Sequence, residues 1–277
     1  MVEMKFWKMH GLGNDYMVVD NRNERIGGDG ANKLAQSLCR RRLSVGADGL
    51  LLLSNSTVAD VKMRMFNADG SEAEMCGNGL RCLVKYCYET NITQKKELEV
   101  ETLAGIKKTW LVVQGIKVKS VKVDMGTPIL DRKAIPMLGQ GTCTDEPLEI
   151  EGKKFKMTCL SVGNPHCVIF VDNVENFPVQ HIGPKIETLR LFPKRTNVEF
   201  AQVLNKGQLS IRVWERGCGE TYACGTGACA AVVAGTLLER TSNRVTAHLL
   251  GGDLMIEYSE NLFMTGPAEK VFEGKLF

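Results

Sequence analysis

RMFNADGSEAEMCGNG, from Arg64 to Gly79, aligns without a gap with RVWERGCGETYACGTG, from Arg212 to Gly227. Arginine, glutamate, cysteine and two glycines coincide in this alignment, and an aromatic residue stands ten positions before the cysteine in both stretches. A second match lies upstream of each stretch, because Gly13-Asn14 leads into YMVVD and Gly163-Asn164 leads into CVIFVD. Two matches in the same order indicate that the chain contains an internal duplication.

Each half of the duplication is expected to hold a sheet, a loop that ends in Cys-Gly-x-Gly, and a helix that starts at that loop. Alternation of apolar and polar residues predicts half-buried, antiparallel strands that start near Val61, Glu97, Val118, Cys167 and Asp253. Helical spacing predicts an amphipathic helix over residues 30–42 and further helices over 79–90 and 228–238. The last helix is apolar on nearly every face, so we expect it to be enclosed.

The domain boundary is expected between Met125 and Cys143, where neither pattern continues and turn-forming glycine and proline occur. A chain of 277 residues is long enough for about two domains, each with its own core. We therefore predict an N-terminal lobe of residues 1–126, to which residues 267–277 return, and a C-terminal lobe of residues 127–266.

Composition excludes several classes of protein. The chain has 35 Lys+Arg against 32 Asp+Glu, a net charge of +3, and this charge forms no basic tail or stripe for nucleic acid. No apolar run approaches the roughly 20 residues that span a bilayer, and the first residues contain no apolar core of a signal peptide. Ten cysteines in such a chain favour free thiols in a reducing compartment. We expect a cytoplasmic protein that binds neither nucleic acid nor a membrane.

Cys76 and Cys224 stand at the same position of the two repeats, each just before a predicted helix. Helix N-termini carry unpaired N–H groups and a partial positive charge, so they bind carboxylates and favour the thiolate form of a nearby cysteine. If the two loops face each other across one cleft, one cysteine can remove a proton from a carbon while the other protonates the opposite face. This arrangement predicts inversion of a stereocentre.

Other interpretations of the cysteines remain open at this point. A buried cysteine is most often only a small apolar side chain. Zinc binding is disfavoured because no C-x2-C pair occurs and no histidine lies at ligand spacing from either Cys-Gly-x-Gly. A thiol redox protein would be expected to carry C-x-x-C, and a hydrolase needs only one cysteine. A non-catalytic protein that only binds amino acids would not need both Cys76 and Cys224.

Six further motifs resemble those of the diaminopimelate epimerase family over nearly the whole chain. They are KMHGLGNDY from Lys8, GADGLLLL from Gly46, FNADGSEAEMCGNGLRC from Phe66, VGNPHCV from Val162, TNVEF from Thr196 and ERGCGETYACGTGACA from Glu215. The resemblance implies an isomerase that interconverts LL- and meso-diaminopimelate for lysine and peptidoglycan synthesis, without pyridoxal phosphate, metal or other cofactor. It also implies an α+β fold of two similar lobes, each a mostly antiparallel mixed sheet wrapped around a central helix, and a homodimer.

The resemblance further implies which residues form the site. Cys76 and Cys224 would be the catalytic acid and base, with His166 and Glu215 supporting the two thiols and Glu215 also binding substrate. The remaining substrate-binding residues would be Asn14, Asn67, Gly77, Asn78, Asn164, Asn197, Arg216, Gly225 and Thr226. Arg216 and the distal asparagines would hold the second amino-acid group of the substrate, since Arg suits a carboxylate and amide oxygens suit an ammonium group.

A different cofactor-independent racemase on the same fold is the nearest alternative. Proline-racemase-like sequences carry histidine in the motif MCGHG, where this chain has Asn78, and they need no distal arginine.

Overall fold

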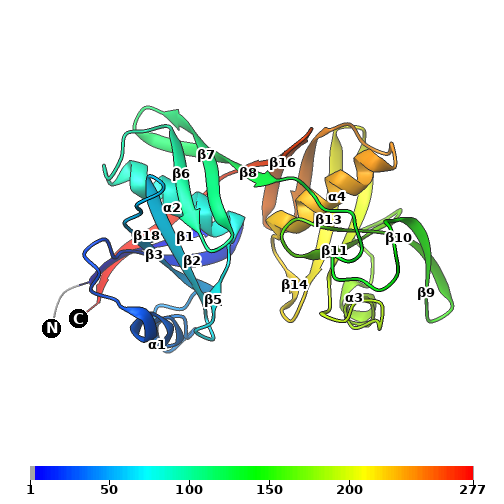
Figure 1. The fold of residues 1–277 in the computed structure, drawn as a ribbon, viewed down its shortest axis with the longest axis horizontal. Helices are drawn as coiled ribbons and strands as arrows, with labels where there is room; N and C mark the ends of the chain where they lie inside the picture. The colour runs from blue at the N-terminus through cyan, green and yellow to red at the C-terminus, as the bar shows by residue number, and fades with distance from the viewer. Residues whose placement is uncertain (1–3, 277) are drawn as a thin grey trace. The chain divides into compact units, whose positions relative to one another are not determined.

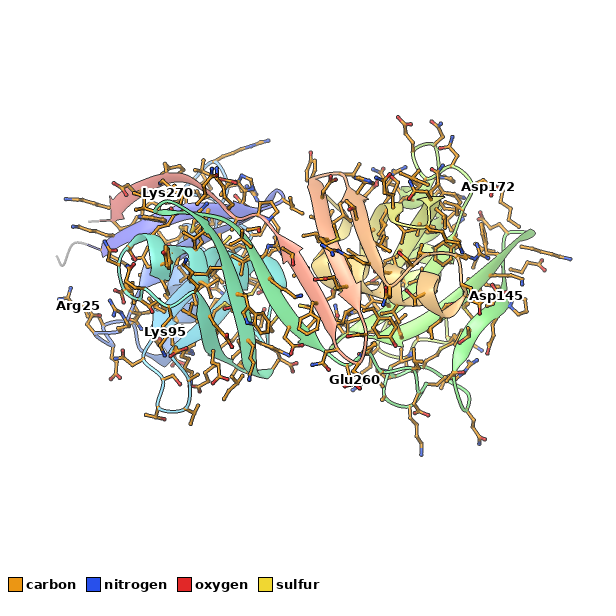
Figure 2. The ribbon with its side chains drawn as sticks, turned by 90° about the horizontal axis from the view of Figure 1, so that it is seen from above. Arg25, Lys95, Asp145, Asp172, Glu260 and Lys270 are labelled. Carbon is orange, nitrogen blue, oxygen red and sulfur yellow. The ribbon has the colours of Figure 1, made fainter. Side chains whose placement is uncertain are left out.

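A computed structural model describes residues 4–276, which form two compact units. Unit 1 contains the chain up to Asp124 and from Thr265 onward, and unit 2 contains Met125–Met264. Charged side chains such as Arg25, Lys95 and Asp172 lie at the surface of their own unit (Figure 2). No helix within the described residues is long and apolar enough to cross a membrane.

Unit 1 is a mixed sheet with helices packed on it (Figure 1). Its strands are β1 (Met4–Gly11), β2 (Asn14–Asp20), β3 (Gly49–Ser54), β4 (Val61–Asn67), β5 (Glu72–Ala73), β6 (Glu97–Thr102), β7 (Gly105–Gln114), β8 (Lys117–Gly126) and β18 (Glu269–Leu276). Its helices are α1 (Gly28–Leu38) and α2 (Gly77–Glu89). The strands pair in the order β18-β1-β2-β3-β4-β6-β7-β8, parallel at β2–β3 and β4–β6 and antiparallel at the other pairs, with β5 added to β4.

Unit 2 contains the strands β9 (Cys143–Ile150), β10 (Lys153–Ser161), β11 (Pro165–Phe170), β12 (Asn197–Asn205), β13 (Gln208–Glu215), β14 (Gly219–Thr221), β15 (Arg244–Leu249), β16 (Gly252–Tyr258) and β17 (Leu262–Gly266), the last of which leads back into unit 1. Its helices are α3 (Val179–Glu187) and α4 (Gly225–Leu237). The strands pair in the order β9-β10-β11-β12-β13-β15-β16, parallel at β11–β12 and β13–β15 and antiparallel at the other pairs, with β14 added to β13.

The six pairings of unit 2 repeat the first six pairings of unit 1, to which unit 1 adds the antiparallel pair β7–β8. This repeated order confirms the predicted duplication. In both units the sequence of contacts is antiparallel, antiparallel, parallel, antiparallel, parallel, antiparallel, and a short strand precedes the central helix. The predicted α+β fold of two similar lobes is therefore confirmed. Each unit also contains parallel pairs of strands. These pairs form where a helix, α1, α2, α3 or α4, connects the two strands, because a parallel connection needs a crossover.

Each unit encloses one central helix within its sheet. Helix α2 contacts β1, β2, β3, β4 and β7, while α4 contacts β10, β11, β12, β13, β15 and β16. Residues 227–235 of α4 are all buried, as its apolar sequence predicted. Helices α1 and α3 each cover a second apolar cluster of their unit, with Ala31 and Ala35 in one and Ile182 and Ile186 in the other.

The helix boundaries differ from the prediction at the N-terminal ends, and α1 also ends at Leu38 and not at residue 42. Helix α2 begins at Gly77 and not at residue 79, and α4 begins at Gly225 and not at residue 228. Helix α1 spans Gly28–Leu38 in place of residues 30–42. The shifts arise because glycine weakens a helical pattern in the sequence, although the first turn tolerates it where the N–H groups have no partner in the helix. As a result, Cys76 and Cys224 are the N-cap residues themselves.

Candidate active site

Both units present an asparagine from a tight turn that only glycine readily forms. Gly13 has φ 90° and Gly163 has φ 91°, in the left-handed region that side chains disfavour. Gly13 lies in the two-residue connection between β1 and β2, where Gly11 pairs with Asn14. Gly163 lies between β10 and β11, where Ser161 pairs with Pro165. The conserved spacing of the repeat thus places Asn14 and Asn164 at equivalent turns.

A repeated ion pair holds the hairpin that leads to each cysteine. Arg64 on β4 donates from Nε to Glu72 Oε1 on β5 at 2.7 Å, and Arg212 on β13 donates from Nε to Glu220 Oε1 at 2.6 Å. These are the arginine and glutamate that coincide in the aligned repeats. Because both pairs are largely shielded from water, each fixes the course of the loop that ends at its cysteine.

Cys76 lies in a polar cluster of unit 1. Its Sγ is 3.0 Å from the hydroxyl oxygen of Tyr16 and 3.7 Å from Asn14 Oδ1. Asn14 Oδ1 also accepts hydrogen bonds from the Tyr16 hydroxyl and from Asn78 Nδ2, the latter at 3.1 Å. The amide of Asn14 is held in this orientation because its Nδ2 donates to Asp48 Oδ2 at 2.9 Å, and a carboxylate only accepts.

Cys224 lies in a more enclosed cluster of unit 2. Its Sγ accepts a hydrogen bond from the backbone N–H of Gly227 at 3.4 Å and is 3.4 Å from Thr226 Oγ1. Burial, followed by the nearby carboxylates of Glu215 and Glu199, raises the pKa of Cys224 well above its ordinary value. Burial also raises the pKa of Glu215, although Thr221 Oγ1 donates to its Oε1 at 2.5 Å. Before substrate binds, this surrounding favours the protonated thiol of Cys224.

His166 and Glu199 form a fully buried pair in the same unit. Each side chain is 0% exposed, and His166 Nδ1 is 2.7 Å from Glu199 Oε1. The other ring nitrogen, Nε2, is 2.9 Å from Asn164 Oδ1. Both ring nitrogens of His166 therefore face oxygen atoms. Parallel pairing of β11 with β12 produces this contact, since His166 stands opposite Asn197, two residues before Glu199.

The residues expected at the far end of the substrate lie in unit 2, except for Asn67, and Asn197 begins β12. Asn197 is 4% exposed, donates from Nδ2 to the backbone oxygen of Pro165 at 2.9 Å and accepts at Oδ1 from the backbone N–H of Arg216 at 2.9 Å. The Arg216 side chain is exposed and donates to the backbone oxygen of Lys194 at 3.1 Å. Asn67 ends β4 in unit 1, where its Nδ2 donates to Ser71 Oγ at 3.0 Å.

The helix-start residues of each expected carboxylate site are also in place. Gly77 and Asn78 begin α2, and Gly225 and Thr226 begin α4. Helix geometry provides no intrahelical carbonyl for these N–H groups, so they can receive an anion. Among residues 4–276, no group of three or more His, Cys, Asp or Glu side chains is arranged to hold a metal ion.

A side chain on the second glycine of Cys-Gly-x-Gly would meet different neighbours in the two units. A Cβ added to Gly227 would lie 2.7 Å from Glu199 Oε1 and 3.3 Å from Cys224 Sγ. At the equivalent Gly79, an added Cβ would meet Leu51 Cδ2 at 3.1 Å. The central helix therefore packs closely on its neighbouring strand in both units, and in unit 2 a Cβ would collide with a member of the buried pair.

Gly227→Ala should destabilise the protein more than Gly79→Ala. Alanine gains about 1 kcal/mol over glycine within a helix, but overpacking costs about 1–3 kcal/mol. Leu51 can turn aside, whereas Glu199 can move only by leaving His166. We expect Gly79→Ala to be nearly neutral and Gly227→Ala to lower the free energy of unfolding by at least about 1 kcal/mol relative to it. Urea unfolding of both variants measures the difference, and equal values would contradict the close packing described.

Four polar residues of these clusters were missed by the sequence analysis: Tyr16, Asp48, Glu199 and Thr221. Tyr16 and Glu199 lie inside the motifs GLGNDY and TNVEF, which marked their neighbours Asn14 and Asn197. A signal was present in the sequence for Glu199, because it is a charged residue between the apolar residues Val198 and Phe200. A carboxylate is rarely buried without a partner, and the structure buries the first five residues of β12.

Comparison with known proteins agrees with the motifs. The family model of diaminopimelate epimerase matches residues 6–130 and 158–271. A diaminopimelate epimerase from Moorella thermoacetica is 54% identical over 275 residues, which cover 98% of this chain and 98% of that protein. The chain belongs to the diaminopimelate epimerase family. The family expected from the motifs, and with it an isomerase, is confirmed.

Other members and fold relatives of the diaminopimelate epimerase family extend the comparison. A diaminopimelate epimerase from Acetivibrio thermocellus is 53% identical over 277 residues, 99% of this chain and 98% of that protein. The crystal structure of a hydroxyproline epimerase from Agrobacterium vitis with bound trans-4-hydroxy-L-proline has a TM-score of 0.72 at 14% identity, covering 99% of this chain and 91% of that one. This second likeness concerns the fold alone.

Proposed function

We propose that this diaminopimelate epimerase interconverts LL- and meso-diaminopimelate with Cys76 and Cys224 as its acid and base, as a step of lysine synthesis. The lobes in this proposal are residues 1–126 with 267–277, and residues 127–266. The observation that carries it is the equivalence of the two cysteines: each is the N-cap of the central helix of its own repeat, at the end of a hairpin held by the same Arg–Glu pair.

The reaction moves one proton off the α-carbon and one proton onto it. In one direction, the Sγ of one cysteine, as a thiolate, takes the α-proton, and the thiol of the other gives its proton to the opposite face. The enzyme then holds the opposite pattern of protonation, and the roles exchange for the reverse direction. Each cysteine needs surroundings that accommodate both the thiol and the thiolate, and the polar neighbours of both sulfur atoms support this.

The negative charge that develops on the substrate needs stabilisation from oriented donors. We propose that the N–H groups of Gly77, Asn78, Gly225 and Thr226 receive the α-carboxylate, since such preorganised donors are most effective where water is excluded. His166 and Glu215 support the thiols and the α-ammonium group. Asn14, Asn67, Asn164, Asn197 and Arg216 complete the substrate contacts, with Arg216 binding the distal carboxylate.

Proton NMR in D2O without added cofactor tests the substrate and the reaction together. We expect deuterium to enter the α-position of LL- and meso-diaminopimelate as the two isomers interconvert, and not to enter L-proline or L-histidine. Exchange of another amino acid in place of diaminopimelate would retain the two-cysteine chemistry and replace the substrate. Absence of exchange with all four compounds would overturn the proposal in favour of a non-catalytic binder.

A cytoplasmic homodimer is part of the same proposal. All ten cysteines are free thiols, which supports a reducing compartment. The dimer rests on the family resemblance, and the mass of the native protein in solution measures it against the 30.6 kDa of one chain.

A further inference from the structure

Tyr16 places a buried hydroxyl group against the sulfur atom of Cys76. Tyr16 lies on β2 and is 1% exposed, and its hydroxyl oxygen is 3.0 Å from Cys76 Sγ. The same hydroxyl contacts Asn14 Oδ1. Nothing in the proposed two-cysteine chemistry has yet used this group, although it touches the atom that would carry the proton.

The hydroxyl can form a hydrogen bond with Cys76 in either protonation state. A tyrosine hydroxyl has one hydrogen to donate and lone pairs to accept. When Cys76 is a thiol, its S–H can donate to the tyrosine oxygen while the tyrosine O–H donates to Asn14 Oδ1. When Cys76 is a thiolate, the O–H can rotate toward Sγ and donate to it. Only the hydrogen atom turns, and no heavy atom has to move.

The surrounding bonds permit this rotation. Asn14 Oδ1 retains a hydrogen bond from Asn78 Nδ2 at 3.1 Å when the tyrosine hydrogen turns away, so it is not left unpaired. The amide of Asn14 cannot turn to offer its nitrogen, because that nitrogen donates to Asp48. Burial and the neighbouring Cys76 raise the pKa of Tyr16 well above its ordinary value, so the phenol keeps its hydrogen and remains a donor.

Tyr16 and His166 occupy equivalent positions in the two repeats. Tyr16 stands two residues after Asn14, and His166 stands two residues after Asn164, on the strands that follow the two equivalent glycine turns. Tyr16 pairs with Gly49 on its parallel neighbour, and His166 pairs with Asn197 on the corresponding strand of unit 2. Both units therefore bury a proton-carrying side chain at the same place in the fold.

We propose that Tyr16 is a catalytic residue whose hydroxyl donates to the Cys76 thiolate and accepts from the Cys76 thiol, so that one rotating hydrogen follows the protonation of the sulfur. The inference rests on the proposed function, because it gives Cys76 both an acid and a base role. In this proposal the Tyr16 side chain stabilises the Cys76 thiolate of unit 1. In unit 2, the Gly227 N–H and Thr226 Oγ1 contact the Sγ of Cys224 in its place.

The experiment follows alkylation of Cys76 by iodoacetamide as a function of pH, since only the thiolate reacts appreciably. Peptide mass spectrometry measures Cys76 and Cys224 separately in the same sample. In Tyr16→Phe, which removes one oxygen atom, we expect alkylation of Cys76 at pH 7 to be about tenfold slower and its pH profile to move to higher pH, as loss of a hydrogen bond to a charged atom predicts. The profile of Cys224 should not change.

Tyr86→Phe is the matched control. Tyr86 is also a buried tyrosine of unit 1, but it lies on α2 against Trp7, with ring centroids 5.1 Å apart. In Tyr86→Phe, the rate and the pH profile of Cys76 alkylation should equal those of the unsubstituted protein. An unchanged Cys76 profile in Tyr16→Phe, or an equal change in Tyr86→Phe, would overturn the inference. Equal thermal unfolding midpoints of the two variants show that both fold.

The two proposals fail in different ways. Alkylation needs no substrate, so it reports on Tyr16 independently of the reaction. In the diaminopimelate assay, Tyr16→Phe should lower kcat about tenfold in both directions and leave KM unchanged, because the lost bond is to the reacting sulfur. If the unsubstituted protein exchanges deuterium as expected but the Cys76 alkylation profile is unchanged in Tyr16→Phe, only the role of Tyr16 is refuted. Absence of exchange in the unsubstituted protein removes the proposed function, whatever the profile shows.

Discussion

Replacing Cys76 or Cys224 with alanine is expected to abolish epimerisation of diaminopimelate in both directions. A single positioned acid or base contributes about 10²–10⁴-fold to a rate, and each variant lacks one of the two. The defect should appear in kcat, since the N–H groups at the starts of α2 and α4 that would bind the carboxylate remain. Proton NMR of the isomer balance in D2O measures the result.

Cys218→Ser is the matched control for these two variants. Cys218 is an exposed thiol only six residues before Cys224, between the positive-φ glycines Gly217 and Gly219. Its substitution should leave the rate of epimerisation unchanged. Full activity in either Cys76→Ala or Cys224→Ala would refute the two-cysteine mechanism, because one thiol cannot act on both faces of a carbon.

Glu199→Ala should produce the largest loss of stability among the substitutions considered. The carboxylate is 0% exposed and is 2.7 Å from His166 Nδ1, so its removal leaves a buried ring nitrogen without its partner. Breaking a buried pair by removing one member costs about 3–5 kcal/mol. We expect a decrease of this size in the free energy of unfolding of unit 2, measured in urea by near-ultraviolet absorption, with Trp214 as its tryptophan probe.

Glu199→Gln separates the loss of the hydrogen bond from the loss of charge. The amide keeps the shape of the side chain and can still bond to His166, so the decrease should be clearly smaller than in Glu199→Ala. Epimerase activity measured on the folded Gln variant then reports whether the charge beside Cys224 matters for the reaction. Equal stability of the Ala variant and the unsubstituted protein would show that the pair contributes nothing to the fold.

The duplication could be predicted from sequence because it leaves identical residues at a fixed offset. Aligned cysteines, glycines and the Arg–Glu pair identified two equivalent helix starts, and the α+β fold of two lobes is confirmed. The role of the repeated Arg64 and Glu72 was not evident from the alignment. Their contact depends on β5 folding back on β4, which two residues of strand do not signal.

The assigned site residues remain predictions, and the structure shows why some neighbours escaped notice. Tyr16 looks like an ordinary strand residue, and the charge of Glu199 does not indicate which residue it contacts. Their contacts with Cys76 and His166 cross 60 and 33 positions of sequence. Such contacts depend on which strands lie side by side and in which register. Alternation predicts a strand, but it does not specify its neighbours.

The starts of the central helices were misplaced for a related reason. Glycine in the first turn lowers the helical signal, so the pattern becomes visible only at residues 79 and 228. Helix α2 also buries Arg81 and Lys85, at 0% and 6% exposed, which no amphipathic pattern predicts. Arg81 Nε donates to the backbone oxygen of Pro267, and Lys85 Nζ donates to that of Val118, so their burial depends on distant segments.

The Arg–Glu pair retained in both repeats separates what the two lobes inherited from what each acquired. A gene duplicated as a whole would begin with the same residues in both copies. Arg64 and Arg212, with their glutamates, stayed alike, while Asn67 became the counterpart of Glu215 and Tyr16 the counterpart of His166. The two repeats therefore share the hairpin that leads to the thiol and differ in the side chains around it. Comparing one half of the chain with the other therefore separates the residues that both repeats share from the residues in which they have diverged.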